Sequence, residues 1–176
     1  MFRAKLSVVS ALSMAGFAVL LAGCSTTEVD KTVGWSPNKI YAEAKDEMSS
    51  GAFDKAVPLF EKLEGRAAGT PLAQQAQLDK AYAQYKNNEQ VQAIATLDRF
   101  IKLHPASPAL DYALYLKGLV SFNDNLGLLS GLSRQDLSER DQKAAKDSFE
   151  AFRELTTRFP DSKYAPDARQ RMTHIV

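Results

Sequence analysis

Cysteine and histidine are scarce in this sequence, and their scarcity excludes several kinds of chemistry. The 176 residues include one cysteine and two histidines, so no disulfide can close within the chain and no thiol–imidazole zinc site can form. His104 and His174 have no metal-ligand partner at helical or loop spacing. No phosphate-binding loop, nucleophile elbow or zinc-protease motif occurs. The sequence therefore predicts a protein that is not an enzyme, with no metal site and no cofactor.

An excess of charge of either sign is also lacking. The chain has 22 basic and 21 acidic side chains. Two of the basic ones, Arg3 and Lys5, precede Cys24, so a chain that starts at Cys24 would have a net charge near −1. Electrostatic capture of nucleic acid requires a basic surface. We therefore expect no nucleic-acid partner.

Long apolar runs are confined to the amino terminus. Residues 6–23 hold no charge, follow the basic tip, and end in Leu21-Ala22-Gly23-Cys24. A basic tip, an apolar stretch and small residues before a cut site are typical of a secretory signal peptide, and this run is marginal for spanning a bilayer. We predict a signal peptide over residues 1–23. The alternative is a membrane-spanning helix that ends in an incidental thiol.

The string Leu-Ala-Gly-Cys resembles the bacterial lipobox. The resemblance implies that Cys24 carries an S-diacylglycerol group and an N-palmitoyl chain, and two or more acyl chains hold a protein stably on a bilayer. In such lipoproteins an aspartate after the cysteine is the common inner-membrane signal, so Ser25 implies the periplasmic face of the outer membrane. Residues 24–36 show no amphipathic period and predict a tether, whose Trp35 docks on the first helix or rests at the lipid interface.

Three later segments share one spacing. Its members are Ala56, Phe60 and Leu63; Ala93, Leu97, Phe100 and Pro105; and Ser148, Phe152, Leu155 and Pro160. Offsets of four and seven place these side chains on one helix face, and the proline ends the helix. Ala68 stands where the first segment should have its proline. The 37 residues from Ala56 to Ala93 are close to the tetratricopeptide period of about 34. The alternative is three unrelated amphipathic helices.

These patterns predict an all-α fold, in which tetratricopeptide-like helix pairs stack into a solenoid. We expect helices at 38–50, 53–65, 72–87, 90–104, 109–122, 139–158 and 164–175. The predicted solenoid covers residues 37–176, with repeats at about 38–67, 72–105 and 109–160 and the start of another at 164–176. The third repeat contains an insertion at 123–138, which either contacts a partner or folds back on the solenoid.

Together these features resemble the BamD (ComL/YfiO) family of outer-membrane assembly lipoproteins. The segments that carry the resemblance are Pro37–Tyr41, Gln74–Asp79, Ala81–Lys86, Asp98–Pro105, Asp111–Gly118, Glu139–Asp141 and Phe159–Tyr164. The resemblance implies a non-enzymatic scaffold for inserting β-barrel proteins into the outer membrane. It also implies binding of unfolded outer-membrane proteins by the amino-terminal repeats, and contacts to the periplasmic POTRA domain of BamA and to BamC, mostly beyond this chain. Because the family has about five repeats, we expect this chain to be an amino-terminal portion.

The candidate peptide-binding residues lie on the first helix of each pair, which we expect to line a concave groove. They are Tyr41, Lys45 and Met48 on the first such helix, Leu78, Tyr82 and Tyr85 on the second, and Tyr112 and Tyr115 on the third. Polar-tipped aromatic side chains suit a half-wet groove. The alternative is that these side chains pack between repeats.

Two other functions stay open at this stage. One is an envelope adaptor that recruits peptidoglycan enzymes or secretins, as other repeat lipoproteins do. The other is DNA uptake, which the competence-linked name of the family suggests, although the near-neutral charge argues against direct DNA binding.

Overall fold

The computed structural model of the protein describes residues 30–122 and 139–175. Two compact units are distinguished, Met1–Val33 and Gly34–Val176. In the first unit, the described residues form a turn in which the Thr32 N–H donates to Asp30 Oδ1 at 2.9 Å. The predicted signal peptide, the lipobox cysteine Cys24 and the insertion at 123–138 lie outside the described residues.

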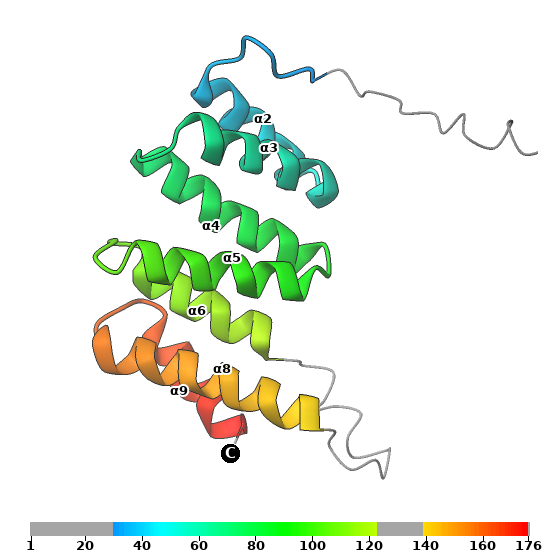
Figure 1. The fold of residues 1–176 in the computed structure, drawn as a ribbon. Helices are drawn as coiled ribbons and strands as arrows, with labels where there is room; N and C mark the ends of the chain where they lie inside the picture. The colour runs from blue at the N-terminus through cyan, green and yellow to red at the C-terminus, as the bar shows by residue number, and fades with distance from the viewer. Residues whose placement is uncertain (1–29, 123–138, 176) are drawn as a thin grey trace, which may run out of the picture. The chain divides into compact units, whose positions relative to one another are not determined.

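Helices account for the regular structure of the second unit (Figure 1). In chain order they are α2 (Pro37–Ser49), α3 (Phe53–Arg66), α4 (Pro71–Lys86), α5 (Gln90–Leu103), α6 (Leu110–Ser121), α8 (Glu139–Arg158) and α9 (Ala165–Ile175). Residues 30–122 and 139–175 contain no strand. The predicted all-α fold is confirmed, and each helix end lies within one residue of its predicted position.

Local chemistry fixes where two of these helices begin. The Ser36 hydroxyl accepts the Lys39 N–H at 3.3 Å ahead of α2, and the Thr70 hydroxyl accepts the Ala73 N–H at 3.2 Å ahead of α4. A proline follows each cap, where its missing N–H costs nothing and its fixed φ suits the first turn. The caps therefore set the register of both helices.

The two helices of a pair are joined by tight turns. Gly51 (φ +82°) joins α2 to α3, and Asn88 (φ +62°) joins α4 to α5. Both residues adopt the left-handed conformation that glycine and asparagine tolerate best. The chain can therefore reverse direction within a few residues and lay the second helix against the first.

A second kind of turn joins one pair to the next. At Ser107 and at Ser162, the serine N–H donates to the end of the preceding helix and the serine carbonyl accepts from the start of the next, at 3.0–3.1 Å. The same turn thus follows Pro105 and Pro160. At the first junction, where Ala68 replaces the proline, Gly69 (φ +79°) makes the turn instead.

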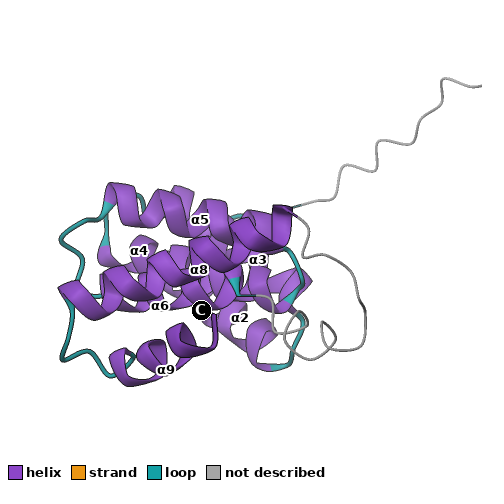
Figure 2. Cartoon of the chain, turned by 90° about the horizontal axis from the view of Figure 1, so that it is seen from below, coloured by secondary structure: helices purple, strands orange, loops and turns teal. Residues whose placement is uncertain are grey.

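The predicted repeat positions form the core. Ala56, Phe60, Leu63, Ala93, Leu97, Phe100, Ser148, Phe152 and Leu155 are all 0% exposed. Three buried clusters follow one another, and each draws its members mainly from three consecutive helices: α2–α4, α4–α6, and α6 with α8 and α9. Each helix packs chiefly on its neighbours in sequence (Figure 2). This arrangement is the solenoid that was predicted.

Trp35 sits at the start of the stack. Its carbonyl accepts a 3.5 Å hydrogen bond from the Arg66 guanidinium, and the Lys39 ammonium lies 4.3 Å from its ring centroid. Of its two predicted positions, Trp35 takes the one docked on the first helix. No helix in the described part of the chain combines the length and the apolar character needed to cross a membrane.

Candidate binding surface on the first helices

The predicted tyrosines lie on α2, α4 and α6, which are the first helices of their pairs. Tyr41, Tyr82, Tyr85, Tyr112 and Tyr115 are all partly exposed, and we call these five side chains the tyrosine row. Each keeps ring or hydroxyl surface in solvent while the rest packs on the stack, which is the amphipathic use that tyrosine permits.

Tyr41 connects the first pair to the second through a carboxylate. Its hydroxyl donates to Asp79 Oδ2 at 3.0 Å, and Lys45 Nζ lies 3.5 Å from Asp79 Oδ1. The Tyr41 ring meets Phe60 edge-on at a centroid distance of 6.2 Å. Burial, followed by the charge of Asp79 and the hydrogen bond to it, raises the pKa of Tyr41 to about 12. The hydroxyl therefore stays protonated and keeps donating at physiological pH.

Tyr112 occupies the middle of the row. Burial raises its pKa most, and the Asp79 carboxylate with the neighbouring hydroxyls of Tyr164, Tyr82 and Tyr115 raises it further. Tyr112 therefore lies close to polar groups of α4, of α6 and of the chain segment that enters α9. The Tyr112 and Tyr164 rings lie 5.5 Å apart.

Tyr115 links α6 to α9. Its ring stacks on Tyr164 at 4.8 Å, and its hydroxyl donates to Asp167 Oδ2 at 2.7 Å. Arg171 donates to the same oxygen at 2.6 Å. Burial raises the pKa of Asp167, but the hydrogen bonds from Arg171 and Tyr115 outweigh that effect and hold it below its usual range. The carboxylate is therefore a fixed negative charge at this end of the row.

Within the described residues, the hydroxyls of Tyr82 and Tyr85 make no hydrogen bond to another repeat. The Tyr82 ring meets Phe53 edge-on at 6.5 Å, and both tyrosines pack partly against the second core cluster. Met48 packs in the same way against the first core cluster. These side chains are anchored by apolar contact alone in the described structure, so their polar tips are the free part of the row.

Leu78 is a correction to the predicted groove. It is 2% exposed and belongs to the second core cluster, so it offers almost no surface to a peptide. It holds the same repeat position as Tyr41 and Tyr115, which lie 37 residues away on either side. Leucine lacks the length and the polar tip that carry those tyrosines out of the core, and α4 is enclosed by α3, α5 and α6.

Four polar or aromatic residues that were not predicted from the sequence complete this surface: Asp79, Tyr164, Asp167 and Arg171. Asp79 is 8% exposed, and its position directly after Leu78 on a largely buried helix is the signal that could have identified it. A carboxylate held at such a place needs partners, and Tyr41 and Lys45 supply them.

The surface offers hydrogen bonding and aromatic contact. Each tyrosine hydroxyl that donates to a carboxylate keeps its lone pairs for an incoming N–H. Within residues 30–122 and 139–175, no group of three or more His, Cys, Asp or Glu side chains is arranged to hold a metal ion. Stacked helix pairs with a polar aromatic surface define a helical-repeat protein of the tetratricopeptide class.

Comparison with known proteins makes the assignment more specific. The sequence model of the family described as "Tetratricopeptide repeat" matches residues 28–172. Three relatives carry the name "Outer membrane protein assembly factor BamD". The protein from Neisseria meningitidis serogroup B is 50% identical over 89% of this chain and 60% of its own length. The protein from Neisseria gonorrhoeae is 45% identical over 98% of this chain and 64% of its own length. The protein from Vibrio cholerae is 35% identical over 87% of this chain and 63% of its own length.

The chain therefore belongs to the BamD family of tetratricopeptide-repeat proteins, as the sequence resemblance predicted. It spans less than two thirds of the length of these curated relatives.

Proposed function

We propose that this chain is part of an outer-membrane lipoprotein scaffold that assists the assembly and insertion of β-barrel proteins. The observation that carries the proposal is the 50% identity, over 89% of the chain, to a protein named as an outer membrane protein assembly factor. Under this proposal the protein binds its partners and catalyses no reaction. Its protein partners are a POTRA domain of BamA and other assembly lipoproteins such as BamC, bound mostly by residues beyond this chain.

The proposal includes a lipid anchor at Cys24. Mass spectrometry of the protein extracted from membranes is expected to find diacylglycerol and an amide-linked acyl chain on this residue. A Cys24→Ser variant cannot form the thioether and should remain in the uncut, unacylated form. A mature protein with a bare thiol would contradict the anchor, although it would leave the helical stack unaffected.

We further propose that the tyrosine row binds an extended segment of an unfolded outer-membrane protein. An extended peptide presents N–H groups along its length, and the row presents hydroxyl lone pairs on three consecutive first helices. The aromatic rings add contact area at a small entropic cost. Asp79 and Asp167 hold the hydroxyls of Tyr41 and Tyr115 in place, so part of the surface is organised before a peptide arrives.

Tyr82 and Tyr85 are the best residues for testing peptide binding. The hydroxyls of Tyr41 and Tyr115 carry contacts between repeats, so replacing them would also disturb the stack. Photo-crosslinking of the full chain to a carboxy-terminal β-strand peptide of a barrel protein should fall at least fivefold with Tyr82→Ala or Tyr85→Ala.

The matched control is Leu103→Ala, which removes an exposed apolar side chain of α5 and should leave the crosslinking unchanged. Circular dichroism should show the same helix content in all variants. Crosslinking that survives both tyrosine substitutions would contradict peptide binding by the row. Co-purification of peptidoglycan enzymes or secretins in place of barrel-assembly proteins would contradict the wider proposal.

A further inference from the structure

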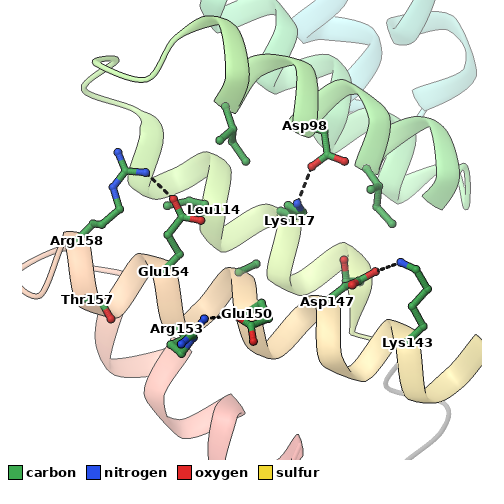
Figure 3. A pocket seen from close by; sticks show the side chains of 14 residues that line it. Asp98, Leu114, Lys117, Lys143, Asp147, Glu150, Arg153, Glu154, Thr157 and Arg158 are labelled. Atoms are coloured by element: carbon green, nitrogen blue, oxygen red, sulfur yellow. Dashed lines mark hydrogen bonds and ion pairs between the residues drawn. The ribbon is translucent and has the colours of Figure 1, made fainter.

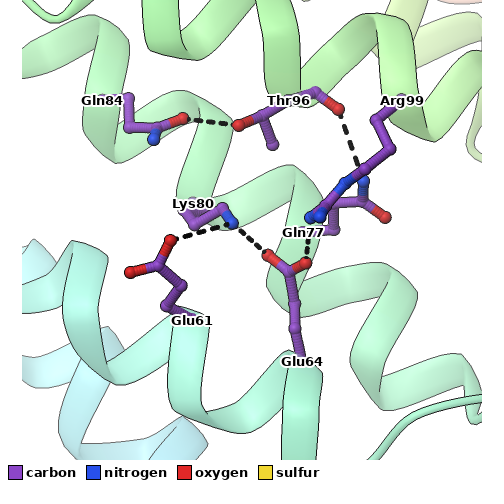
Figure 4. A network of polar contacts seen from close by, with 7 residues as sticks. All are labelled: Glu61, Glu64, Gln77, Lys80, Gln84, Thr96 and Arg99. Atoms are coloured by element: carbon purple, nitrogen blue, oxygen red, sulfur yellow. Dashed lines mark hydrogen bonds and ion pairs between the residues drawn. The ribbon is translucent and has the colours of Figure 1, made fainter.

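Seven polar side chains form a network where α3, α4 and α5 meet (Figure 4). They are Glu61 and Glu64 from α3, Gln77, Lys80 and Gln84 from α4, and Thr96 and Arg99 from α5. The Lys80 ammonium lies 2.7 Å from Glu64 and 3.8 Å from Glu61, and Arg99 also pairs with Glu64. The Thr96 hydroxyl donates to Gln84 at 2.8 Å. The network thus bridges the two consecutive second helices, α3 and α5.

The repeat register identifies the residues that replace this network at the next junction. A shift of 37 residues, the spacing of Ala56 and Ala93, moves from the first pair to the second and from α4 to α6. A shift of 55 residues, the spacing of Pro105 and Pro160, moves from α5 to α8. Under these shifts Lys80 and Glu61 become Lys117 and Asp98, which form the same ion pair at 2.6 Å.

The remaining members of the network are lost at the second junction. Glu64 is replaced by Ile101 and Arg99 by Glu154, so no ion pair bridges α5 and α8 there. Gln84 is replaced by Ser121, Thr96 by Ala151 and Gln77 by Leu114. The buried hydrogen bond between the Thr96 and Gln84 side chains therefore has no equivalent at the second junction. The Ser121 hydroxyl is buried, in a residue 5% exposed, and has no hydrogen-bond partner among the residues that the structure describes.

The result is a cleft of about 640 Å³ between α5 and α8, with α6 as its floor (Figure 3). Ser121 lines it together with Leu114, Ile94 and Ile101. A buried polar atom without a partner costs free energy. Ser121 therefore brings an unused hydrogen-bonding group to the inner end of the cleft.

The two walls of the cleft differ in character. Ile94 and Ile101 of α5 form an apolar stripe, which Val91, one turn before Ile94, extends with 71% exposure and which Asp98 interrupts between Ile94 and Ile101. On α3 the positions equivalent to Val91 and Ile101 are acidic, Asp54 and Glu64. Of the three equivalent positions on α3 only Val57, the counterpart of Ile94, is apolar, so the stripe is longer at the second junction.

The cleft is also lined by charged side chains of both signs in equal number, six of them on α8, with Asp98 on α5 and Lys117 on α6. Lining residues comprise the basic Lys117, Lys143, Arg153 and Arg158 and the acidic Asp98, Asp147, Glu150 and Glu154. The charged side chains of α8 form ion pairs with one another, at i,i+3 and i,i+4 spacing along the helix. Such exposed pairs stabilise a helix only weakly. They can therefore exchange partners with an incoming molecule at little cost.

We propose that this cleft binds an amphipathic helix of a partner protein. Its apolar face would cover the α5 stripe, which spans about 15 Å from Val91 to Ile101, or about three helical turns. Its polar edge, with charges of both signs, would pair with α8, and one polar side chain would reach Ser121. The balanced charge does not favour a nucleic acid or an anionic lipid headgroup. This site is separate from the tyrosine row.

The test uses the full chain in lipid nanodiscs and a fluorescent model peptide of about 14 residues. The peptide contains leucine, lysine and glutamate, with the leucines at i, i+3, i+4 and i+7. A second peptide of equal composition has its leucines at every second position and cannot form an apolar helix face. Fluorescence anisotropy should show saturable binding of the first peptide, at least tenfold tighter than that of the second.

One double substitution should close the cleft. Ile101→Glu with Glu154→Arg recreates the Glu64–Arg99 bridge of the first junction, and it should weaken binding of the amphipathic peptide at least tenfold. Leu103→Glu places the same new charge on α5 outside the cleft and should change binding less than twofold. Should the double variant lose its helical circular dichroism, Ser121→Ala provides the second test, because it removes a hydroxyl without adding bulk and should weaken binding at least threefold.

Equal binding of both peptides, or undiminished binding to the folded cleft variants, would overturn the proposal. Two other occupants would overturn it as well. One is a second copy of the chain, seen as concentration-dependent association that Ile101→Glu abolishes. The other is residues 123–138, seen as an intramolecular cross-link from a photoreactive group at position 101.

Discussion

Gly118 shows how closely two helices approach at a single residue. A Cβ atom built at this glycine of α6 would lie 2.4 Å from Cε1 of Phe152, whose side chain is fully buried in α8. The Ser148 hydroxyl donates to the Gly118 carbonyl at 2.8 Å, which fixes the two backbones together. Small residues at this repeat position, Ala44 and Ala81 in the earlier pairs, are likewise fully buried.

Gly118→Ala should destabilise the protein, although alanine is the better helix former. The added methyl group must displace a buried aromatic ring, and such overpacking costs about 1–3 kcal/mol. Gly65 in α3 is the matched control, since nothing lies within 4 Å of its Cβ position. Gly65→Ala should stabilise by about 0.5–1 kcal/mol. Urea denaturation of both variants measures the two free energies of unfolding, and equal effects would contradict the close approach.

Tyr41 should make stability depend on alkaline pH. Its pKa is raised to about 12 in the folded protein, against about 10 in an unfolded chain. Stability from this group is fully present below pH 10 and is lost as the pH rises from about 10 to about 12. Tyr41→Phe cannot ionise. Denaturant unfolding should show wild type losing stability relative to Tyr41→Phe across that interval, whereas a constant difference up to pH 12 would contradict the Asp79 contact.

At the scale of helices, the sequence predicted the elements better than their buried polar partners. Caps, prolines and left-handed turn residues are local signals, so helix ends were predicted within one residue. Lys80, Gln77 and Gln84 are nearly fully buried, and no local pattern indicates this. Their burial depends on which side chains α3 and α5 direct over α4. Leu78 was misplaced for the same reason, because helical spacing identifies a face and does not tell how many neighbours cover it.

Lys80 and Lys117 occupy equivalent repeat positions but differ in how deeply they are buried, so replacing each of them tests the effect of burial on the ion pair. The Lys80 side chain is 5% exposed and pairs with Glu64, which is 16% exposed, whereas Lys117 and Asp98 are 28% and 52% exposed. Lys80→Ala should cost about 2–3 kcal/mol, because Arg99 compensates only part of the Glu64 charge left behind. Lys117→Ala should cost less than about 1 kcal/mol. Thermal denaturation that ranks Lys117→Ala as the more damaging would contradict the network.

At the scale of the whole molecule, the described helices form a chain of neighbouring contacts, and its surfaces are defined by how those neighbours join. The tyrosine row follows the first helices, and the α5–α8 cleft lies between two second helices. The tyrosines were predicted from spacing alone. The cleft was not, because it arises where five polar residues of one junction are replaced at the next, and only the structure shows which residues face each other.

The most direct test of the proposed role is to deplete the protein that contains this chain in its own bacterium. Folded β-barrel proteins in the outer membrane are then measured by their heat-dependent shift in gel mobility. The account predicts that folded barrels decline while unfolded barrel proteins accumulate in the periplasm, and that the wild-type gene restores them. Undiminished amounts of folded barrel proteins after complete depletion would contradict it.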